Sequence, residues 1–147
     1  MARTLHVLAK PKGENRMLKN RTARILVVDD DRIVRLTLEN LLRKAGHQVV
    51  CAENGLKAVL LCAEYSFDIG IFDMNMPQMD GWTAVSQLRT SGFNFPIIAY
   101  TTYSLPGDEA RAKSAGCTLF LGKPADPGKV METIGAALGW DDKPSFN

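Results

Sequence analysis

The sequence has no apolar run that approaches the roughly 20 residues needed to cross a bilayer. Its beginning, Met-Ala-Arg, lacks the apolar stretch and the small-residue cleavage site of a secretory signal. Both absences argue against a membrane-spanning or exported protein, so we expect a cytoplasmic one. With 147 residues, 46% of them hydrophobic and 23% charged, the chain suits one globular domain.

Cysteine is also scarce. The three cysteines are an odd number and have no CxxC spacing: Cys51, Cys62 and Cys117. Each lies in an apolar stretch, which favours buried free thiols over disulfides or metal ligands. The two histidines, His6 and His47, have no partner spacing that suggests catalysis or metal binding.

Charge is distributed unevenly along the chain. Residues 1–24 carry seven Lys or Arg against Glu14 alone, a net charge of +6, whereas residues 25–147 carry 11 basic against 15 acidic residues, a net charge of −4. Residues 1–23 have no strong periodicity and contain Pro11-Lys12-Gly13, so we interpret them as a flexible basic extension. The extension is either a solvated arm or a segment that binds an acidic partner, a membrane surface or nucleic acid.

From Arg24 onward, short β-rich apolar runs alternate with segments of helical periodicity. This pattern predicts an α/β domain over residues 24–140, a (βα)5 chain with a doubly wound parallel sheet, followed by a short tail at 141–147. The predicted strands are Ile25–Val28, Gln48–Ala52, Ile69–Phe72, Pro96–Tyr100 and Leu119–Leu121. The predicted helices are Val34–Ala45, Gly55–Glu64, Gly81–Ser91, Gly107–Ala115 and Val130–Leu138.

Polar residues follow four of these strands. Asp29-Asp30-Asp31 ends the first strand, Asp73 the third and Thr101 the fourth, and Lys123 closely follows the fifth. In an open parallel sheet such residues meet at one crevice. Converging carboxylates need a cation, and their hard oxygens suit Mg²⁺. A lysine and a hydroxyl beside them suit a phosphoryl group carried on a carboxylate, with Asp73 as the candidate nucleophile. Alone, the three acids are equally compatible with a simple helix N-cap.

Four segments, in this order, resemble the response-regulator receiver family of two-component signalling. They are Ile25-Leu-Val-Val-Asp-Asp-Asp31, Ile71-Phe-Asp-Met-Asn-Met-Pro-Gln-Met-Asp-Gly81, Ala99-Tyr-Thr101 and Gly122-Lys-Pro124. The resemblance covers residues 24–139, and the segment from Asp73 to Gly81 is the most specific part of it. It implies a flavodoxin-like fold with strand order 2-1-3-4-5.

The same resemblance implies a role for each residue around the phosphoryl group. Asp73 would be the phosphoacceptor, Asp30 a direct Mg²⁺ ligand, Asp29 a ligand through water, and the backbone carbonyl of Asn75 a further ligand. Asp31 would begin the following helix. The domain would catalyse its own phosphorylation from a histidine kinase or a histidine phosphotransfer protein, and its own dephosphorylation.

The resemblance also implies a switch. Thr101 would bond the phosphoryl oxygen, Lys123 would pair with it, and the Lys123-Pro124 peptide bond would be cis. Movement of Thr101 would make room for Phe120 to rotate and would change the face formed by helix four, strand five and helix five. A plain core role for Phe120 is the alternative.

Some residues depart from the family pattern. Thr102 stands where a smaller residue is usual, Ala125 where a bulkier one is usual, and Ser104-Leu-Pro-Gly107 gives the fourth helix an unusual entry. Tyr103, two residues after Thr101, leads to the hypothesis that it shields the acyl phosphate from water. These departures would make the output face, formed by helix four, strand five and helix five, unusual for the family.

Two other functions fit part of the sequence. A phosphatase of the haloacid-dehalogenase type would use Asp29 as its nucleophile, but the chain lacks an evident cap insertion, and Asp73 would have no role. A pseudo-receiver would bind partners without phosphorylation. No DNA-binding or catalytic output domain follows Asp141, so we expect a stand-alone receiver or one cut from a larger protein such as a hybrid kinase, acting on an unknown protein target.

Overall fold

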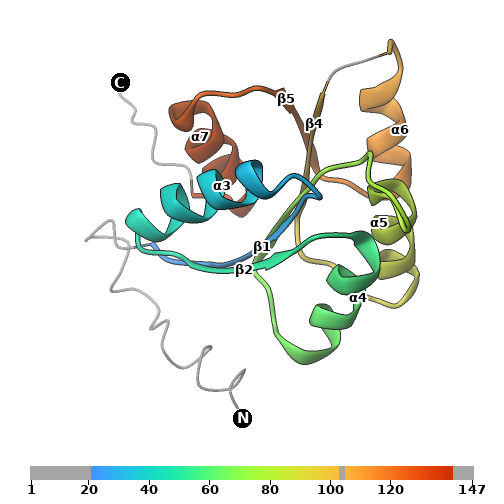
Figure 1. The fold of residues 1–147 in the computed structure, drawn as a ribbon, viewed down its shortest axis with the longest axis horizontal. Helices are drawn as coiled ribbons and strands as arrows, with labels where there is room; N and C mark the ends of the chain where they lie inside the picture. The colour runs from blue at the N-terminus through green and yellow to red at the C-terminus, as the bar shows by residue number, and fades with distance from the viewer. Residues whose placement is uncertain (1–20, 103–104, 141–147) are drawn as a thin grey trace.

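The computed structural model describes residues 21–102 and 105–140, in which five strands alternate with five helices (Figure 1). The strands are β1 (Arg24–Val28), β2 (Gln48–Ala52), β3 (Ile69–Phe72), β4 (Ile97–Thr102) and β5 (Leu119–Lys123). The helices are α3 (Arg32–Lys44), α4 (Gly55–Glu64), α5 (Gly81–Thr90), α6 (Asp108–Ala115) and α7 (Pro127–Leu138). The predicted alternation is confirmed.

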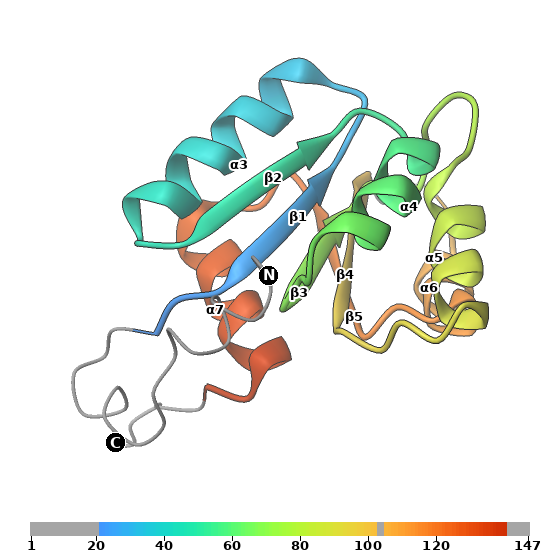
Figure 2. The same cartoon turned by 90° about the horizontal axis from the view of Figure 1, so that it is seen from below.

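All five strands are parallel and lie in the order β2-β1-β3-β4-β5, as expected. Helices α3 and α7 cover one face of the sheet, and α4, α5 and α6 cover the other (Figures 1 and 2). Such a three-layer arrangement follows from right-handed crossovers between parallel strands. The order reverses after β1, so the chain has its topological switch point between β1 and β3.

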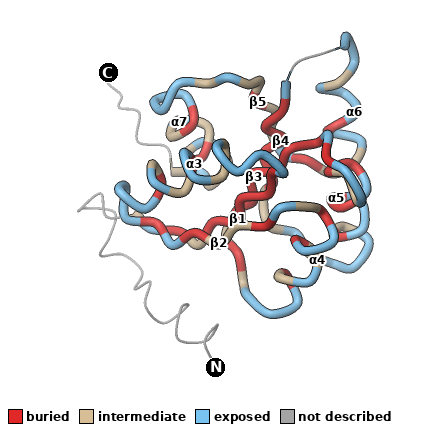
Figure 3. The backbone as a smooth tube through the Cα atoms, in the orientation of Figure 1, coloured by how far each residue is buried: buried red, intermediate tan, exposed pale blue. Residues whose placement is uncertain are grey.

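The central strand β1 shows why the sequence is so apolar here. Ile25 and Val27 pack under α3 and α7, whereas Leu26 and Val28 pack under α4 and α5. All four are buried, because successive side chains of a strand point to opposite faces and both faces are covered. Figure 3 shows the buried strands as a continuous layer inside the helices.

Short polar side chains begin four of the helices. Asp31 accepts hydrogen bonds from the backbone N–H groups of Ile33 and Val34 at the start of α3, which confirms it as a helix-start residue. Asn54, Asp80 and Asp126 cap α4, α5 and α7 in the same way. The Asp126 cap and Pro127 at the first helical turn explain why α7 begins at Pro127 and not at Val130 as predicted.

The last two strands are two residues longer at their carboxyl ends than predicted. Parallel pairing continues through Thr101 with Gly122 and through Thr102 with Lys123. The polar character of these residues hid this extension, because strand prediction rests on apolar runs. Thr101 and Lys123 are therefore held by the sheet itself, which limits their backbone motion.

The three cysteines are free thiols, as predicted, but only two are buried. Burial raises the pKa of Cys62 to about 11 and that of Cys117 to about 12, so both thiols are inert at neutral pH. Cys51 is half-buried because β2 is an edge strand.

Among the described residues, no helix is both long enough and apolar enough to cross a membrane.

The first residues described pack against the domain. Ala23 is buried, and its N–H donates to Nδ1 of His47 at 3.1 Å. The His47 ring stacks on Trp140 with centroids 5.9 Å apart. His47, to which the sequence assigned no role, thus joins both ends of the described chain, and burial lowers its pKa. The proposed extension lies largely in residues 1–20, outside the described residues.

Gly81 is expected to contribute to stability because its neighbours leave no room for a side chain. A Cβ at this position would lie against the carbonyl oxygen of Asp73 and 2.6 Å from the Cα of Met74. Backbone atoms cannot yield as a flexible side chain can, so Gly81→Ala should reduce the free energy of unfolding by about 1–3 kcal/mol. Denaturant unfolding measures this. The control is Gly135→Ala in α7, where the added methyl group meets nothing closer than 3.8 Å and should be neutral or slightly stabilising.

Candidate functional site

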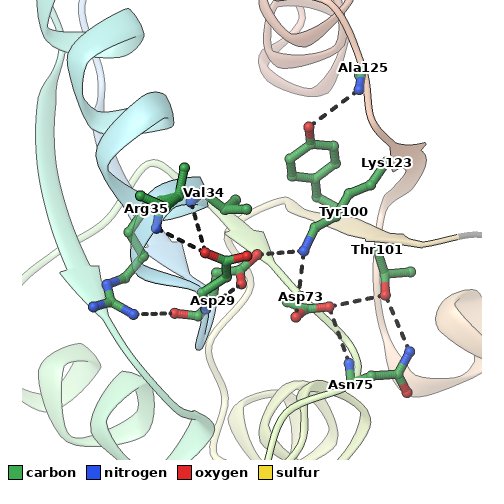
Figure 4. A network of polar contacts seen from close by, with 11 residues as sticks. Asp29, Val34, Arg35, Asp73, Asn75, Tyr100, Thr101, Lys123 and Ala125 are labelled. Atoms are coloured by element: carbon green, nitrogen blue, oxygen red, sulfur yellow. Dashed lines mark hydrogen bonds and ion pairs between the residues drawn. The ribbon is translucent and has the colours of Figure 1, made fainter.

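Four strand ends converge at the carboxyl edge of the sheet, as predicted (Figure 4). Asp29 follows β1, Asp73 follows β3, Thr101 lies at the end of β4, and Lys123 ends β5. Asp29, Asp73 and Thr101 are buried. Polar side chains at such depth need partners, and the polar contacts of this site supply them.

Asp29, Asp30 and Asp73 form an acidic cluster. One carboxylate oxygen from each lies within 4.8 Å of the others. Asp29 and Asp73 are 2% and 6% exposed, whereas Asp30 is open to solvent. Burial raises the pKa of Asp73, and repulsion from Asp29 raises it further; Lys123, the N–H of Asn75 and the Thr101 hydroxyl oppose this shift.

Lys123 bridges the two buried carboxylates. Its Nζ lies 2.7 Å from Asp29 Oδ2 and 3.6 Å from Asp73 Oδ2. Burial alone would lower the pKa of Lys123, but hydrogen bonds and attraction to Asp29 and Asp73 outweigh burial and raise it. The ammonium group therefore stays charged at neutral pH and is closer to Asp29 than to Asp73.

Thr101 and Asn75 complete the surroundings of Asp73. The Thr101 hydroxyl donates to Asp73 Oδ1 at 3.0 Å, and the backbone N–H of Asn75 donates to the same oxygen at 3.3 Å. The side-chain amide of Asn75 donates to Thr101 Oγ1, also at 3.3 Å. One oxygen of Asp73 is thus hydrogen-bonded, while the other faces Lys123 (Figure 4).

The chemistry of this cluster fits a hard divalent cation. Three carboxylates in reach of one point supply the oxygen ligands that Mg²⁺ prefers, and exposed Asp30 leaves one side open to water. A softer transition metal would favour histidine or cysteine ligands, whereas this cluster of described residues consists of three aspartates.

Arg35 is a supporting residue that the sequence did not reveal. From the first turns of α3, its guanidinium donates to the backbone carbonyl of Asp29 at 2.8 Å. The backbone N–H of Asp31 donates to the Asp29 carboxylate at 2.9 Å. A signal was present, because a long basic side chain in the first turns of a helix leans back toward residues at its N-terminus.

A second support holds the loop from Asp73 to Gly81. The N–H of Gly55 donates to the carbonyl of Met79 at 3.0 Å, and the side-chain amide of Asn54 donates to Gln78 at 3.1 Å. Gln78 adopts φ of +66°, a conformation uncommon outside glycine. The start of α4 therefore positions the loop that carries Asn75, although α4 and this loop are distant in sequence.

Other residues singled out in the sequence lie farther from these contacts. Phe120 is half-buried in β5 and packs against the core between the sheet and α6. The Lys123-Pro124 bond is cis, as expected, and the N–H of Ala125 donates to the hydroxyl of Tyr100 at 3.4 Å. Tyr103 and Ser104 lie outside the described residues, so the shielding hypothesis for Tyr103 stays a hypothesis.

Comparison with known proteins identifies relatives of two kinds. Protein PilH of Pseudomonas aeruginosa is 36% identical over 118 residues, which cover 79% of this chain and 98% of that protein. The sensory/regulatory protein RpfC of Xanthomonas campestris is 37% identical over 119 residues, but the match covers only 16% of that longer protein. The chain is thus similar to almost the whole of PilH and to only a segment of RpfC.

Solved structures of other proteins share the fold of this chain. Chemotaxis response regulator CheY4 of Vibrio cholerae has a TM-score of 0.75 and 33% identity, with 80% of this chain and all of that one covered. The receiver domain of a sensor histidine kinase of Pseudomonas aeruginosa, with magnesium in its active-site cleft, has a TM-score of 0.74 and 28% identity, covering 81% and 99%. The family model for the response regulator receiver domain matches residues 25–135. The chain therefore belongs to the response regulator receiver domain family of two-component signalling.

Proposed function

We propose that the chain accepts a phosphoryl group on Asp73 and changes its output surface in response. The observation that carries this proposal is the position of Asp73: a buried carboxylate with Lys123 at one oxygen and Thr101 at the other, next to a second acid. A carboxylate with no further function would be costly in such a place. A phosphoryl acceptor needs this combination of nucleophile, cation and hydrogen-bond donor.

In the proposed reaction, a carboxylate oxygen of Asp73 attacks the donor's phosphorus, and the bond from phosphorus to the leaving group breaks as the new P–O bond forms. A phosphohistidine donor leaves as imidazole and takes up a proton. The metal would neutralise charge on the phosphoryl oxygens; Asp30 would hold it directly, Asp29 through water, and Asp73 and the carbonyl of Asn75 would complete its protein ligands.

Lys123 and Thr101 then respond to the new charge. A phosphoryl group brings strong acceptor oxygens within reach of the Lys123 ammonium, which is expected to leave Asp29 and pair with the phosphoryl group. The Thr101 hydroxyl is expected to move from Asp73 to a phosphoryl oxygen and to leave the Asn75 amide. Rotation of Phe120 would pass the change to the face of α6, β5 and α7.

The donor is proposed to be a histidine kinase or a histidine phosphotransfer protein, and the receiver of the signal another protein. A histidine kinase partner follows from the family. The nearly full-length match to PilH supports a stand-alone receiver, and the match to a segment of RpfC supports a receiver within a larger protein. Residues 1–23 are proposed to form a basic N-terminal extension that precedes the receiver domain of residues 24–140.

The geometry disfavours the phosphatase alternative. Both oxygens of Asp29 accept a hydrogen bond, Oδ1 from the N–H of Asp31 and Oδ2 from Lys123 at 2.7 Å, whereas Oδ2 of Asp73 has Lys123 only at 3.6 Å. A nucleophile needs an oxygen whose lone pair is not already held in a hydrogen bond, so Asp73 suits this role better than Asp29. The pseudo-receiver alternative leaves the combination of Asp73, Thr101 and Lys123 without a purpose.

Removal of the metal tests the proposed function. Incubation of the full chain with a small phosphodonor such as acetyl phosphate and Mg²⁺ is expected to add the mass of one phosphoryl group. Chelation of Mg²⁺ should slow this modification by about 100-fold or more, because the metal stabilises the charge that develops on the transferring oxygens. Intact-protein mass spectrometry measures the modified fraction. A pseudo-receiver would stay unmodified with and without the metal.

A further inference from the structure

Helix α4 carries an apolar stripe on its outer side that nothing in the described structure covers. Leu56 and Leu60 are 49% and 60% exposed, and Ala63 is exposed beside them. Figure 3 shows the outer side of this helix open to solvent. Leu56 and Leu60 lie one turn apart, so their exposed side chains form one apolar patch and not two isolated contacts with water.

The exposed residues of α4 are arranged symmetrically about Leu60. Leu56 and Ala63 are seven residues apart, so they lie two turns apart on one flank of the stripe. Lys57 and Glu64, also seven residues apart and both exposed, lie on the other flank. Around the helix, Leu60 lies between the two flanks. Along the helix, it lies between the two members of each of these pairs.

We propose that α4 pairs with α4 of a second copy of this chain, antiparallel, with a two-fold axis beside Leu60. Such an axis reverses the helix direction and keeps each flank opposite the same flank of the partner. Leu60 then meets Leu60 of the other copy, Leu56 lies near its Ala63, and Lys57 lies opposite its Glu64. The contact contains two symmetry-related ion pairs and a continuous apolar centre.

The alternative orientation lacks this complementarity. In a parallel pair, the flank with Lys57 and Glu64 would face the partner's flank with Leu56 and Ala63, which would cover charges with apolar groups. An open groove lined by Leu56, Lys57, Leu60, Leu61 and Glu64 gives a leucine of the partner a place to insert. Charge complementarity therefore favours the antiparallel dimer.

The length of α4 limits the strength of the contact. Its 10 residues span about 15 Å, so the interface falls below the roughly 1,200 Å² of total area usual for stable complexes. The dimer is therefore weak and reversible, with a dissociation constant in the micromolar range or above. It depends on no feature of the phosphorylation chemistry, so its failure would leave the proposed function intact.

Sedimentation velocity of the full chain across roughly 1 µM to 1 mM tests the dimer. The parent chain should shift from monomer to dimer, and Leu60→Glu should raise the dissociation constant about tenfold or more by placing two like charges at the axis. Leu36→Glu in α3, where Leu36 is 41% exposed, is the matched control and should leave the dimer unchanged. A parent that stays monomeric, or a dimer that persists in Leu60→Glu, overturns the proposal.

Exchanging the charges at Lys57 and Glu64 tests whether the two α4 helices are antiparallel. Lys57→Glu and Glu64→Lys should each weaken the homodimer by about tenfold, because each places two pairs of like charges across the axis. A mixture of these two variant chains should associate as the parent does, since every flank position then faces an opposite charge. A mixture that associates no better than either variant alone would contradict the antiparallel arrangement, and so would single variants that dimerise normally.

Discussion

Asp73→Asn is expected to abolish phosphorylation and, in Mg²⁺-free buffer at neutral pH, to raise the thermal midpoint of unfolding. The amide is a poor nucleophile, so modification by a phosphodonor should fall below detection. The stability gain follows from the pKa of Asp73, which burial and then Asp29 raise above the ordinary value. An acid with a raised pKa favours the folded state below its unfolded-state pKa, and that contribution is lost as pH rises through the folded-state pKa.

Above its unfolded-state pKa, Asp73 therefore destabilises the folded state relative to a neutral group, and the amide removes this penalty. The amide oxygen of the variant can still accept from Thr101 and the N–H of Asn75. The gain should be on the order of a few degrees and should shrink as the pH is lowered, because Asp73 of the parent then becomes neutral as well. Calorimetric scans at several pH values measure it. A variant less stable than the parent at neutral pH would contradict the pKa direction.

Lys123→Ala is expected to slow phosphorylation from a small phosphodonor by about 100- to 1,000-fold, a usual effect of removing one group that stabilises transition-state charge. The ammonium lies 3.6 Å from the second oxygen of Asp73, beside the place that the phosphoryl group would occupy. Its loss also leaves Asp29 and Asp73 without their shared cation, so Mg²⁺ should stabilise this variant more than the parent.

Two measurements separate these effects. The rate of modification at saturating Mg²⁺ reports the chemical role of Lys123, and the Mg²⁺-induced increase in the unfolding midpoint reports its electrostatic role. Lys129→Ala is the control, because Lys129 is an exposed lysine of α7 whose ammonium lies 3.9 Å from Glu132, outside the acidic cluster. A Lys123→Ala chain phosphorylated at the parent rate would show that this lysine does not act on the transferring group.

The sequence was sufficient to predict the fold because its local and global signals agree. The continuous apolar run Ile25–Val28 indicates a strand buried on both faces, and the structure places it at the centre of the sheet. The helix at Gly55–Glu64 was predicted with the bounds that the structure shows, and Asn54 caps its start. Where the boundary was wrong, as at Pro127, a cap outside the periodic apolar pattern determined the start of the helix.

The convergence of Asp29, Asp73, Thr101 and Lys123 was also predictable, because parallel strands bring their carboxyl ends to one edge. The contacts that position these four side chains could not be predicted from the sequence. The bond from Arg35 to the Asp29 carbonyl and the bond from Gly55 to Met79 join a residue to a backbone group on another element. Such bonds depend on how elements lie in three dimensions, which periodicity does not report. The preference of Lys123 for Asp29 depends in the same way on a distance, 2.7 Å against 3.6 Å.

The central claim is that Asp73, and not another carboxylate of the cluster, carries the phosphoryl group. The most direct measurement phosphorylates the full chain with acetyl phosphate and Mg²⁺, traps the acyl phosphate by borohydride reduction and locates the reduced residue by peptide mass spectrometry. Modification is expected at Asp73 alone. Modification at Asp29 or Asp30, or none while the chain is folded and Mg²⁺ is bound, would contradict it.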